Sequence, residues 1–314
     1  MLQLLTFSVL NSVLYGMLLF LLASGLTLIF SMMGVLNIAH ASFYMLGAYL
    51  GFEITRLLGF WPALVIAPLL VGVLGALVER FGLRRLHARG HVAELLFTFG
   101  LAFIIAELVQ LFWGRMPVDY RTPLELGSTA FTLFGTSYPT FRVFILVVAA
   151  LVFCVLLMLL TRTRIGLIVR AALAHPKMVG MLGHDVPTIF MLVFGLGSGL
   201  AGLAGVLAGP LFVTQPSMAE TYGPILFVII VVGGLGSLSG ALIASLLVGF
   251  IQTFAVSMNV SLADALAAIG VAAPAGMFDE IWAVTIAQIA PVLPYGLMVV
   301  LLIFRPTGLF GRRA

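Results

Sequence analysis

The chain is built from long apolar runs that are separated by short polar breaks. A helix needs about 20 apolar residues to cross a bilayer, and most runs reach that length. None alternates between apolar and polar positions as a barrel strand would. The pattern therefore predicts an all-α, polytopic membrane protein with about 8–10 transmembrane or re-entrant helices. The runs are Phe7–Phe30, Val35–Thr55, Ala63–Gly82, Ala93–Trp113, Arg142–Leu160, Thr188–Gly209, Ile225–Val232, Ala241–Val256 and Val284–Phe304.

Composition supports this interpretation and excludes several classes of protein. Of the 314 residues, 62% are hydrophobic and 8% are charged, whereas soluble proteins carry about 25% charged residues. We expect a single transmembrane domain over residues 1–314, with the lipid bilayer as its solvent. The net charge of +4 is scattered between apolar runs, so it does not indicate a nucleic-acid partner. The lone Cys154 allows no internal disulfide and belongs to no metal or redox motif.

Basic residues predict the orientation, because they favour cytoplasmic loops. Eleven of the 15 fall in three regions, which we therefore assign to the cytoplasm together with the C-terminus. The N-terminus, the segment Gly114–Thr140 and the acidic segment Val260–Trp282 should lie outside. The eleven basic residues are Arg80, Arg84, Arg85, Arg89, Arg162, Arg164, Arg170, Lys177, Arg305, Arg312 and Arg313.

Two breaks between apolar runs carry no basic residue, one at Phe30–Val35 and one at Gly233–Leu238. The run Gly223–Val232 before the second break would rise only about 15 Å as a helix, half of a bilayer. Irregular backbone inside a membrane survives only where protein or a water-filled cavity satisfies its polar groups. Paired breaks of this kind in transporters mark the permeation site. We expect the two breaks to approach each other near mid-membrane.

Polar residues gather at both breaks. Asn37, His40 and Ser42 follow the first within six positions, although an unpartnered amide or hydroxyl in hydrocarbon costs roughly 2–7 kcal/mol. Two interpretations remain open: these side chains line a solute pathway, or they pin neighbouring helices together. For His40 alone, packing is the favoured role. The second break would contribute Gly234, Gly236 and Ser237 to the same pathway.

Small residues recur in GLGSGLAGLAGVLAG, which spans Gly195–Gly209. Gly195 and Gly199 are four residues apart, as are Gly205 and Gly209. This spacing lets helix backbones approach closely. We predict that this segment is a tightly packed helix.

The segment Thr161–Asp185 is too polar to span a membrane and too apolar for a solvated loop. It predicts two short amphipathic helices separated by Pro176, because a proline disfavours helix at the preceding residue. Their apolar faces need a partner, which could be the membrane surface or a groove of another protein. We treat residues 161–187 as a cytoplasmic coupling loop.

The chain carries no recognisable energy source or catalytic site. Its only lysine, Lys177, follows Pro176, so a nucleotide-binding P-loop is absent. No zinc-protease motif exists, and no metal site or catalytic residue is predicted. Glu107 is the one acid deep in a predicted span, whereas ion-coupled carriers bury charged relays. A stand-alone ion-coupled carrier is therefore the weaker alternative, and an intramembrane enzyme is weaker still.

Four motifs resemble those of LivH-type permeases, the membrane subunits of ABC importers for branched-chain amino acids. They are SGLTLIFSMMGVLNIAHASFYMLGAY, TRIGLIVRAALAHPKMVGMLG, VVGGLGSLSGAL and RPTGLFG, in that order along the chain. The resemblance implies two cytoplasmic ATPase subunits, a second, LivM-type permease and an extracytoplasmic solute-binding protein. It also implies that this chain binds no cofactor itself, since ATP is used by the partner subunits.

The resemblance places Gly166, Arg170, Ala171 and Gly183 in the segment that contacts the ATPase. It implies a multi-pass protein of the bacterial plasma (inner) membrane with a cytoplasmic C-terminus. The expected function is import of branched-chain amino acids or related small polar organic solutes, with urea and short amides as open alternatives.

Overall fold

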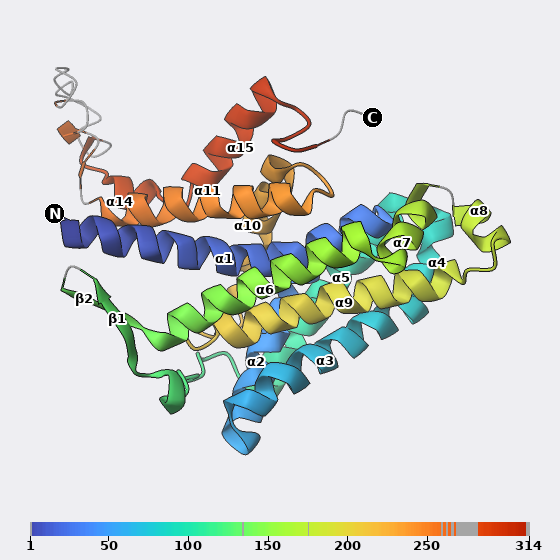
Figure 1. Ribbon diagram of the computed structural model, residues 1–314, viewed down its shortest axis with the longest axis horizontal. Coiled ribbons are helices and arrows are strands. Elements are labelled where there is room, and N and C mark those ends of the chain that lie inside the picture. Colours follow the sequence, from blue (N-terminus) through green and yellow to red (C-terminus); the bar gives the residue numbers. More distant parts are fainter. Residues whose placement is uncertain are drawn as a thin grey trace.

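The computed structural model describes residues 2–133, 135–174, 176–258, 260–261, 263–264, 267 and 282–311. It is a bundle of long helices, as predicted (Figure 1). Each of the nine apolar runs contains a helix. These helices are α1 (Leu2–Met33), α2 (His40–Leu58), α3 (Phe60–Val78), α5 (His91–Trp113), α6 (Thr140–Arg162), α9 (Val186–Ala208), α10 (Met218–Gly233), α11 (Leu238–Ser257) and α15 (Leu293–Phe304).

Six of these helices are long and apolar enough to cross a membrane, namely α1, α3 with its extension, α5, α6, α9 and α11. As predicted, α10 is short, with 16 residues. The last run was predicted as one segment, but it contains a short helix α14 (Ile286–Ile289) and α15, which begins only at Leu293. Pro291 and Pro294 explain this division, because proline cannot continue a helix from the preceding turn.

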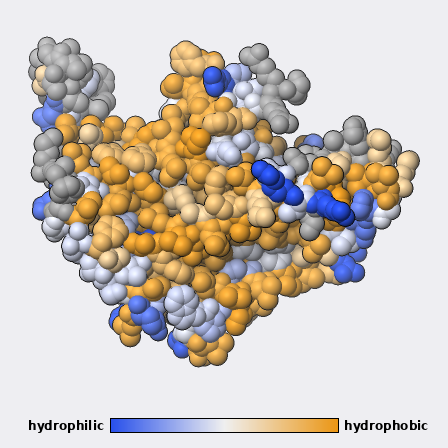
Figure 2. All heavy atoms as spheres, in the orientation of Figure 1, coloured by the Kyte–Doolittle hydropathy of each residue, from blue (hydrophilic) through white to orange (hydrophobic). Residues whose placement is uncertain are grey.

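Two helices form the centre of the bundle. The apolar window of α1 is 78% buried and that of α9 is 61% buried, whereas α5 and α6 are each 17% buried. The most extensive contacts join α9 to α3 and α2, and α1 to α11 and α9. The outer helices carry exposed apolar side chains such as Leu96, Leu151 and Ile303. In Figure 2 apolar residues cover the middle of the visible face, and polar residues lie toward its edges.

The small residues of α9 pack against neighbouring backbones, which confirms the predicted close approach. A methyl group added at Gly195 would lie 2.9 Å from the carbonyl oxygen of Gly72 on α3. One added at Gly205 would lie 2.2 Å from the carbonyl oxygen of Tyr44 on α2. Side chains at these positions would force the helices apart, so α9 joins α2 and α3 at backbone distance.

The connection between α5 and α6 contains a hairpin that was not predicted. Strands β1 (Thr129–Leu133) and β2 (Thr136–Pro139) pair antiparallel, with an irregularity between Thr129 and Phe131. Phe131 stacks on Tyr138 with ring centroids 5.4 Å apart, and Tyr138 is buried. Strands of four or five residues in the connection between two apolar runs are hard to separate from loop by periodicity alone.

The connections divide between the two ends of the bundle. The short elements η1 (Glu79–Leu83), α4 (Arg84–Leu86) and η2 (His87–Arg89) extend α3, and α7 (Arg164–Ala174) and α8 (Pro176–Met181) precede α9. In Figure 1, α4, α7 and α8 gather at one end, and the N-terminus and hairpin lie at the other. Two of the three basic regions thus share an end. Arg312, Arg313 and most of the acidic segment 260–282 lie outside the described residues.

Thiol labelling checks which end faces the cytoplasm. In a Cys154→Ser background, we expect Arg89→Cys to resist a membrane-impermeant thiol reagent in intact cells and Ser128→Cys to react. Both positions are exposed, so burial does not protect either one. After permeabilisation both should react at similar rates. Labelling of Arg89→Cys alone in intact cells would reverse the orientation.

Candidate functional site

The two breaks lie beside each other, as predicted. The first spans the residues between α1 and α2, where Gly34 has φ +67°, and the second lies between α10 and α11. A methyl group added at Gly236 would lie 3.2 Å from Cβ of Ser31, which is in the last turn of α1. Gly236 has φ +80°, a conformation that side chains strain, so both space and backbone favour glycine there.

The mid-membrane depth expected for the breaks is not supported. Helix α1 has 32 residues, about 48 Å at 1.5 Å per residue, and can cross the whole core before the first break. The second break bonds to the C-terminal turn: Leu309 N donates to Val232 O at 2.8 Å, and Phe310 N to Gly233 O at 3.1 Å. Because that turn precedes the basic tail, both observations favour a position near the basic end of the bundle.

The residues of the second break have identifiable structural roles. Gly234 packs against the C-terminal turn, where an added methyl group would lie 2.4 Å from the backbone nitrogen of Gly311. The Ser237 side chain caps α11 and accepts a hydrogen bond from Gly240 N at 3.1 Å. Of the three predicted residues, Gly236 is the one whose described neighbour, Ser31, lies at the first break. The pathway interpretation therefore rests on Gly236 more than on Gly234 or Ser237.

The polar residues of the first break are all buried, with different partners. His40 Nε2 lies 3.0 Å from the carbonyl oxygen of Leu22, which joins α2 to α1 and fits the favoured packing role. Ser42 Oγ donates to Ala102 O at 3.4 Å. Asn37 is 1% exposed, and neither of its side-chain polar atoms has a hydrogen-bond partner among the described residues. Asn37 is thus the residue for which packing accounts least.

One cavity includes a predicted site residue. It has a volume of about 560 Å³ and lies between α2, α5, α10 and α15. Ser42 lines it, with Ala102, Glu220, Gly223 and Tyr295. Its walls are otherwise largely apolar. Its size falls in the roughly 300–1,000 Å³ range of ligand pockets, so it is one candidate part of a solute pathway.

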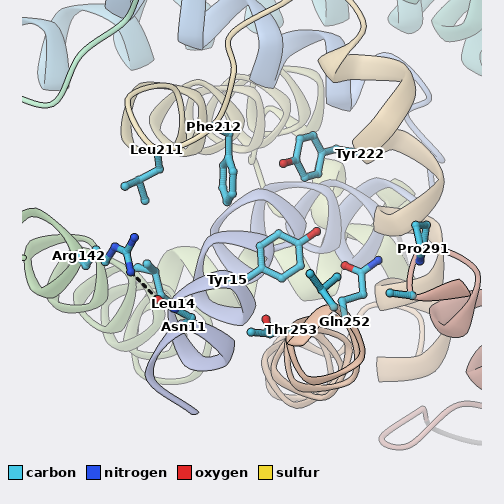
Figure 3. Close-up of a pocket in the computed structure, with 12 residues that line it drawn as sticks. Asn11, Leu14, Tyr15, Arg142, Leu211, Phe212, Tyr222, Gln252, Thr253 and Pro291 are labelled. Carbon is cyan, nitrogen blue, oxygen red and sulfur yellow. Dashed lines mark hydrogen bonds between the residues drawn. The ribbon is translucent and has the colours of Figure 1, made fainter. Parts of the chain in front are cut away.

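A second cavity was not predicted. It has a volume of about 450 Å³ and lies near the hairpin end of α1 and α6 (Figure 3). Arg142 and Asn11 form part of its wall, and Arg142 Nη1 donates to Asn11 Oδ1 at 2.6 Å. The other polar lining residues are Tyr15, Tyr222, Gln252 and Thr253. Together with Asn11 and Arg142 they come from four helices, so no local sequence pattern could bring them together.

The linings of the two cavities adjoin at aromatic residues along the first turns of α10. Tyr222 lines the second cavity, and the next residue, Gly223, lines the first. Tyr222 contacts Tyr44 of α2, with ring centroids 5.4 Å apart, and Phe212, with centroids 6.3 Å apart. Tyr222 and the rings it contacts therefore lie where the linings of the two cavities adjoin on α10.

The predicted coupling segment folds as two short helices separated at Pro176, as expected. Gly166 packs under α6, because a methyl group there would lie 2.3 Å from the carbonyl oxygen of Leu159. Ala171 and Gly183 are exposed. The side chain of Arg170 lies outside the described residues. Gly166 therefore supports the segment from within, and Ala171 and Gly183 lie on its surface.

Helix α8 and the turn after it present apolar side chains to the surroundings. Met178 is 60% exposed, Met181 85% and Leu182 77%. The opposite side packs inward through Val179, which contacts Ala172 and Val186. The turn ends at Asp185, which caps α9 and accepts hydrogen bonds from Thr188 that lower the pKa of its carboxyl group. The segment is therefore folded and capped, and its exposed apolar surface of Met178, Met181 and Leu182 has no partner among the described residues.

A polar cluster lies beside this segment and was not predicted as a unit. Buried Glu79 accepts a hydrogen bond from Arg84 at 3.1 Å, and Arg84 also donates to the carbonyl oxygen of Pro187 in α9 at 2.7 Å. Buried Glu94 pairs with the imidazole of His87. Arg84 therefore connects the end of α3 to the first turn of α9, immediately after the coupling segment.

These features define the class of the protein: it is an integral membrane protein of bundled helices with cavities between them and an unpartnered apolar surface at one end. Residues 8–302 match the sequence model of the family described as "Branched-chain amino acid transport system / permease component". The match covers most of the chain, and the chain belongs to this family.

Similar proteins span nearly the same length. "High-affinity branched-chain amino acid transport system permease protein BraD" of Pseudomonas aeruginosa is 28% identical over 306 residues, covering 93% of this chain and 91% of that protein. "High-affinity branched-chain amino acid transport system permease protein LivH" of Salmonella typhimurium is 26% identical over 321 residues, covering 96% and 94%. A probable LivH of Methanocaldococcus jannaschii is 27% identical over 253 residues, covering 77% and 78%.

Proposed function

We propose that the chain is the membrane-spanning permease subunit of an ABC importer for branched-chain amino acids or related small organic solutes. Separate ATPase subunits drive it, and the chain itself binds no cofactor. The observation that carries this proposal is the exposed apolar surface of α8, at the end of a permease-family chain that lacks a nucleotide-binding loop. Such a surface at a basic, cytoplasmic end suits a groove of another protein.

The proposed assembly contains two cytoplasmic ATPase subunits, a second permease of the LivM type and an extracytoplasmic solute-binding protein. The complex lies in a bacterial plasma membrane, with the C-terminus of this chain in the cytoplasm. The exposed apolar residues of α5 and α6 supply surface for lipid or for the second permease. The end of the bundle that carries α4, α7 and α8 is assigned to the cytoplasm because basic residues lie near these helices.

Reconstituted transport tests the proposal. The chain is co-expressed with the ATPase, permease and binding-protein genes that neighbour it, and the purified complex is placed in liposomes with ATP inside. We expect uptake of a radiolabelled branched-chain amino acid that requires ATP and the binding protein. Uptake by this chain alone, driven by an ion gradient without ATP, would favour the stand-alone carrier instead.

The pathway role of the two breaks gives a further prediction. Gly236→Leu should reduce uptake per assembled complex at least about tenfold, because it fills the space beside Ser31 in a backbone that strains side chains. Asn37→Leu should slow uptake without loss of assembly if its unpartnered amide faces the solute. His40→Gln should be tolerated better than His40→Leu, because glutamine can keep the hydrogen bond to Leu22 O.

Gly100→Leu is the matched control, since an added Cβ at Gly100 meets nothing within 4 Å. The measurement is initial uptake divided by the amount of complex recovered. Unchanged specific uptake in Gly236→Leu and Asn37→Leu would show that the breaks serve packing alone.

A further inference from the structure

The cavity beside Arg142 combines one positive charge with apolar walls (Figure 3). Leu14, Leu211, Phe212 and Val256 form much of the wall, and Gln252 and Thr253 supply neutral polar groups. Among the described residues, no acidic side chain lines it. Its volume of about 450 Å³ is typical of a pocket for a small molecule. These walls suit a solute with an apolar body and a group that a cation recognises.

Arg142 has no acidic partner among the described residues. Its guanidinium donates to the neutral Asn11 Oδ1 and lies over the rings of Phe7 and Tyr138, at 5.7 and 5.8 Å from their centroids. These contacts hold the side chain in place and leave its charge uncompensated. A guanidinium offers five donors in a planar fork, of which Asn11 occupies one nitrogen. The fork is suited to a carboxylate.

We propose that this cavity is a solute site in which Arg142 binds the carboxylate of a small solute with an apolar side chain. The solute's apolar part lies against Leu14, Leu211 and Phe212. Because the part of the lining that the structure describes holds no carboxylate, an α-amino group contributes less to recognition here than the acid group does. The inference rests on the proposed transport function, since it names the chemical group by which the permease selects its solute.

Charge-selective labelling tests the site without depending on transport. The purified full chain with its co-expressed partners carries Cys154→Ser and Thr253→Cys, which places a thiol in the cavity wall. We compare the labelling rates of two methanethiosulfonate reagents, one anionic and one cationic. Replacement of Arg142 by glutamine should lower the anionic-to-cationic rate ratio at least fivefold. Arg142→Lys should keep most of the ratio, because the charge remains.

Arg121→Gln is the matched control. Arg121 lies in the connection between α5 and α6, before the hairpin. Its side chain is exposed and pairs with Asp119 outside the cavity. Its replacement should leave the ratio unchanged. The proposal would be overturned if the anionic-to-cationic labelling ratio were the same with Arg142 and with Arg142→Gln while both proteins eluted as folded complexes.

Protection by solutes identifies the group that is recognised. At millimolar concentration, L-leucine and 4-methylpentanoate should each slow labelling of Thr253→Cys, whereas leucinamide, which lacks the carboxylate, should not. The protection should disappear in Arg142→Gln and persist in Arg121→Gln. Equal protection by leucinamide would exclude carboxylate recognition. Carboxylate-specific protection without ATP-dependent uptake would support the solute site and contradict the importer function. ATP-dependent uptake without protection would support the importer function and contradict the solute site.

Discussion

Replacing Met181 and Leu182 together by glutamate should abolish ATP-driven uptake and leave the permease folded. Both side chains are largely exposed, at 85% and 77%, so the folded chain loses little packing when they change. In the assembled importer they would be buried in the ATPase groove. Burying two such side chains stabilises a contact by roughly 3 kcal/mol or more, which is about 100-fold in affinity. Two carboxylates in that groove would add a desolvation cost.

The measurement has three parts: recovery of the permease in membranes, co-purification of the ATPase, and uptake in liposomes. We expect normal recovery, loss of the ATPase from the complex and no uptake above background. Leu124→Glu is the control, because Leu124 is 96% exposed and lies in the connection at the opposite end of the bundle. It should retain the ATPase and normal uptake. Retention of the ATPase by the double variant would remove α8 from the proposed interface.

Most of the helices could be predicted from local sequence patterns. Long apolar runs and the proline at position 176 are signals that act within one segment, and the helices follow them closely. The same holds for the tight packing of α9, since small residues four apart lie on one helix face. The contact between the two breaks was also predicted, because both lacked basic residues and both carried glycine.

The cavity beside Arg142 could not be predicted in the same way. Asn11, Arg142 and Thr253 are isolated polar residues in three different apolar runs, and each alone resembles a helix end or a packing contact. Only the fold brings them together. The helix before the first break is also longer than predicted, because α1 runs from Leu2 to Met33 and not from Phe7 to Phe30.

A single methyl group at the crossing of α2 and α9 should strongly destabilise the fold. An added Cβ at Gly205 would lie 2.2 Å from the carbonyl oxygen of Tyr44 and 2.6 Å from the backbone nitrogen of Ala48. These are backbone atoms inside a helix, so they cannot move aside as a flexible side chain would. The helices must separate, and the buried contacts of α9 with α2 weaken along their length. Overpacking typically costs about 1–3 kcal/mol, and a backbone clash belongs at the upper end.

Gly205→Ala should therefore give little folded protein on size-exclusion chromatography and lower the melting temperature of what is recovered. Gly100→Ala on α5 is the matched control, because its added Cβ meets nothing within 4 Å. Alanine forms helix better than glycine by about 1 kcal/mol, so this control should be neutral or slightly stabilising. If helix propensity alone decided the result, alanine would stabilise the protein at both positions. The clash at Gly205 instead predicts that Gly205→Ala destabilises the protein and Gly100→Ala does not. Equal yield and melting temperature for the two variants would show that α2 and α9 do not cross at backbone distance.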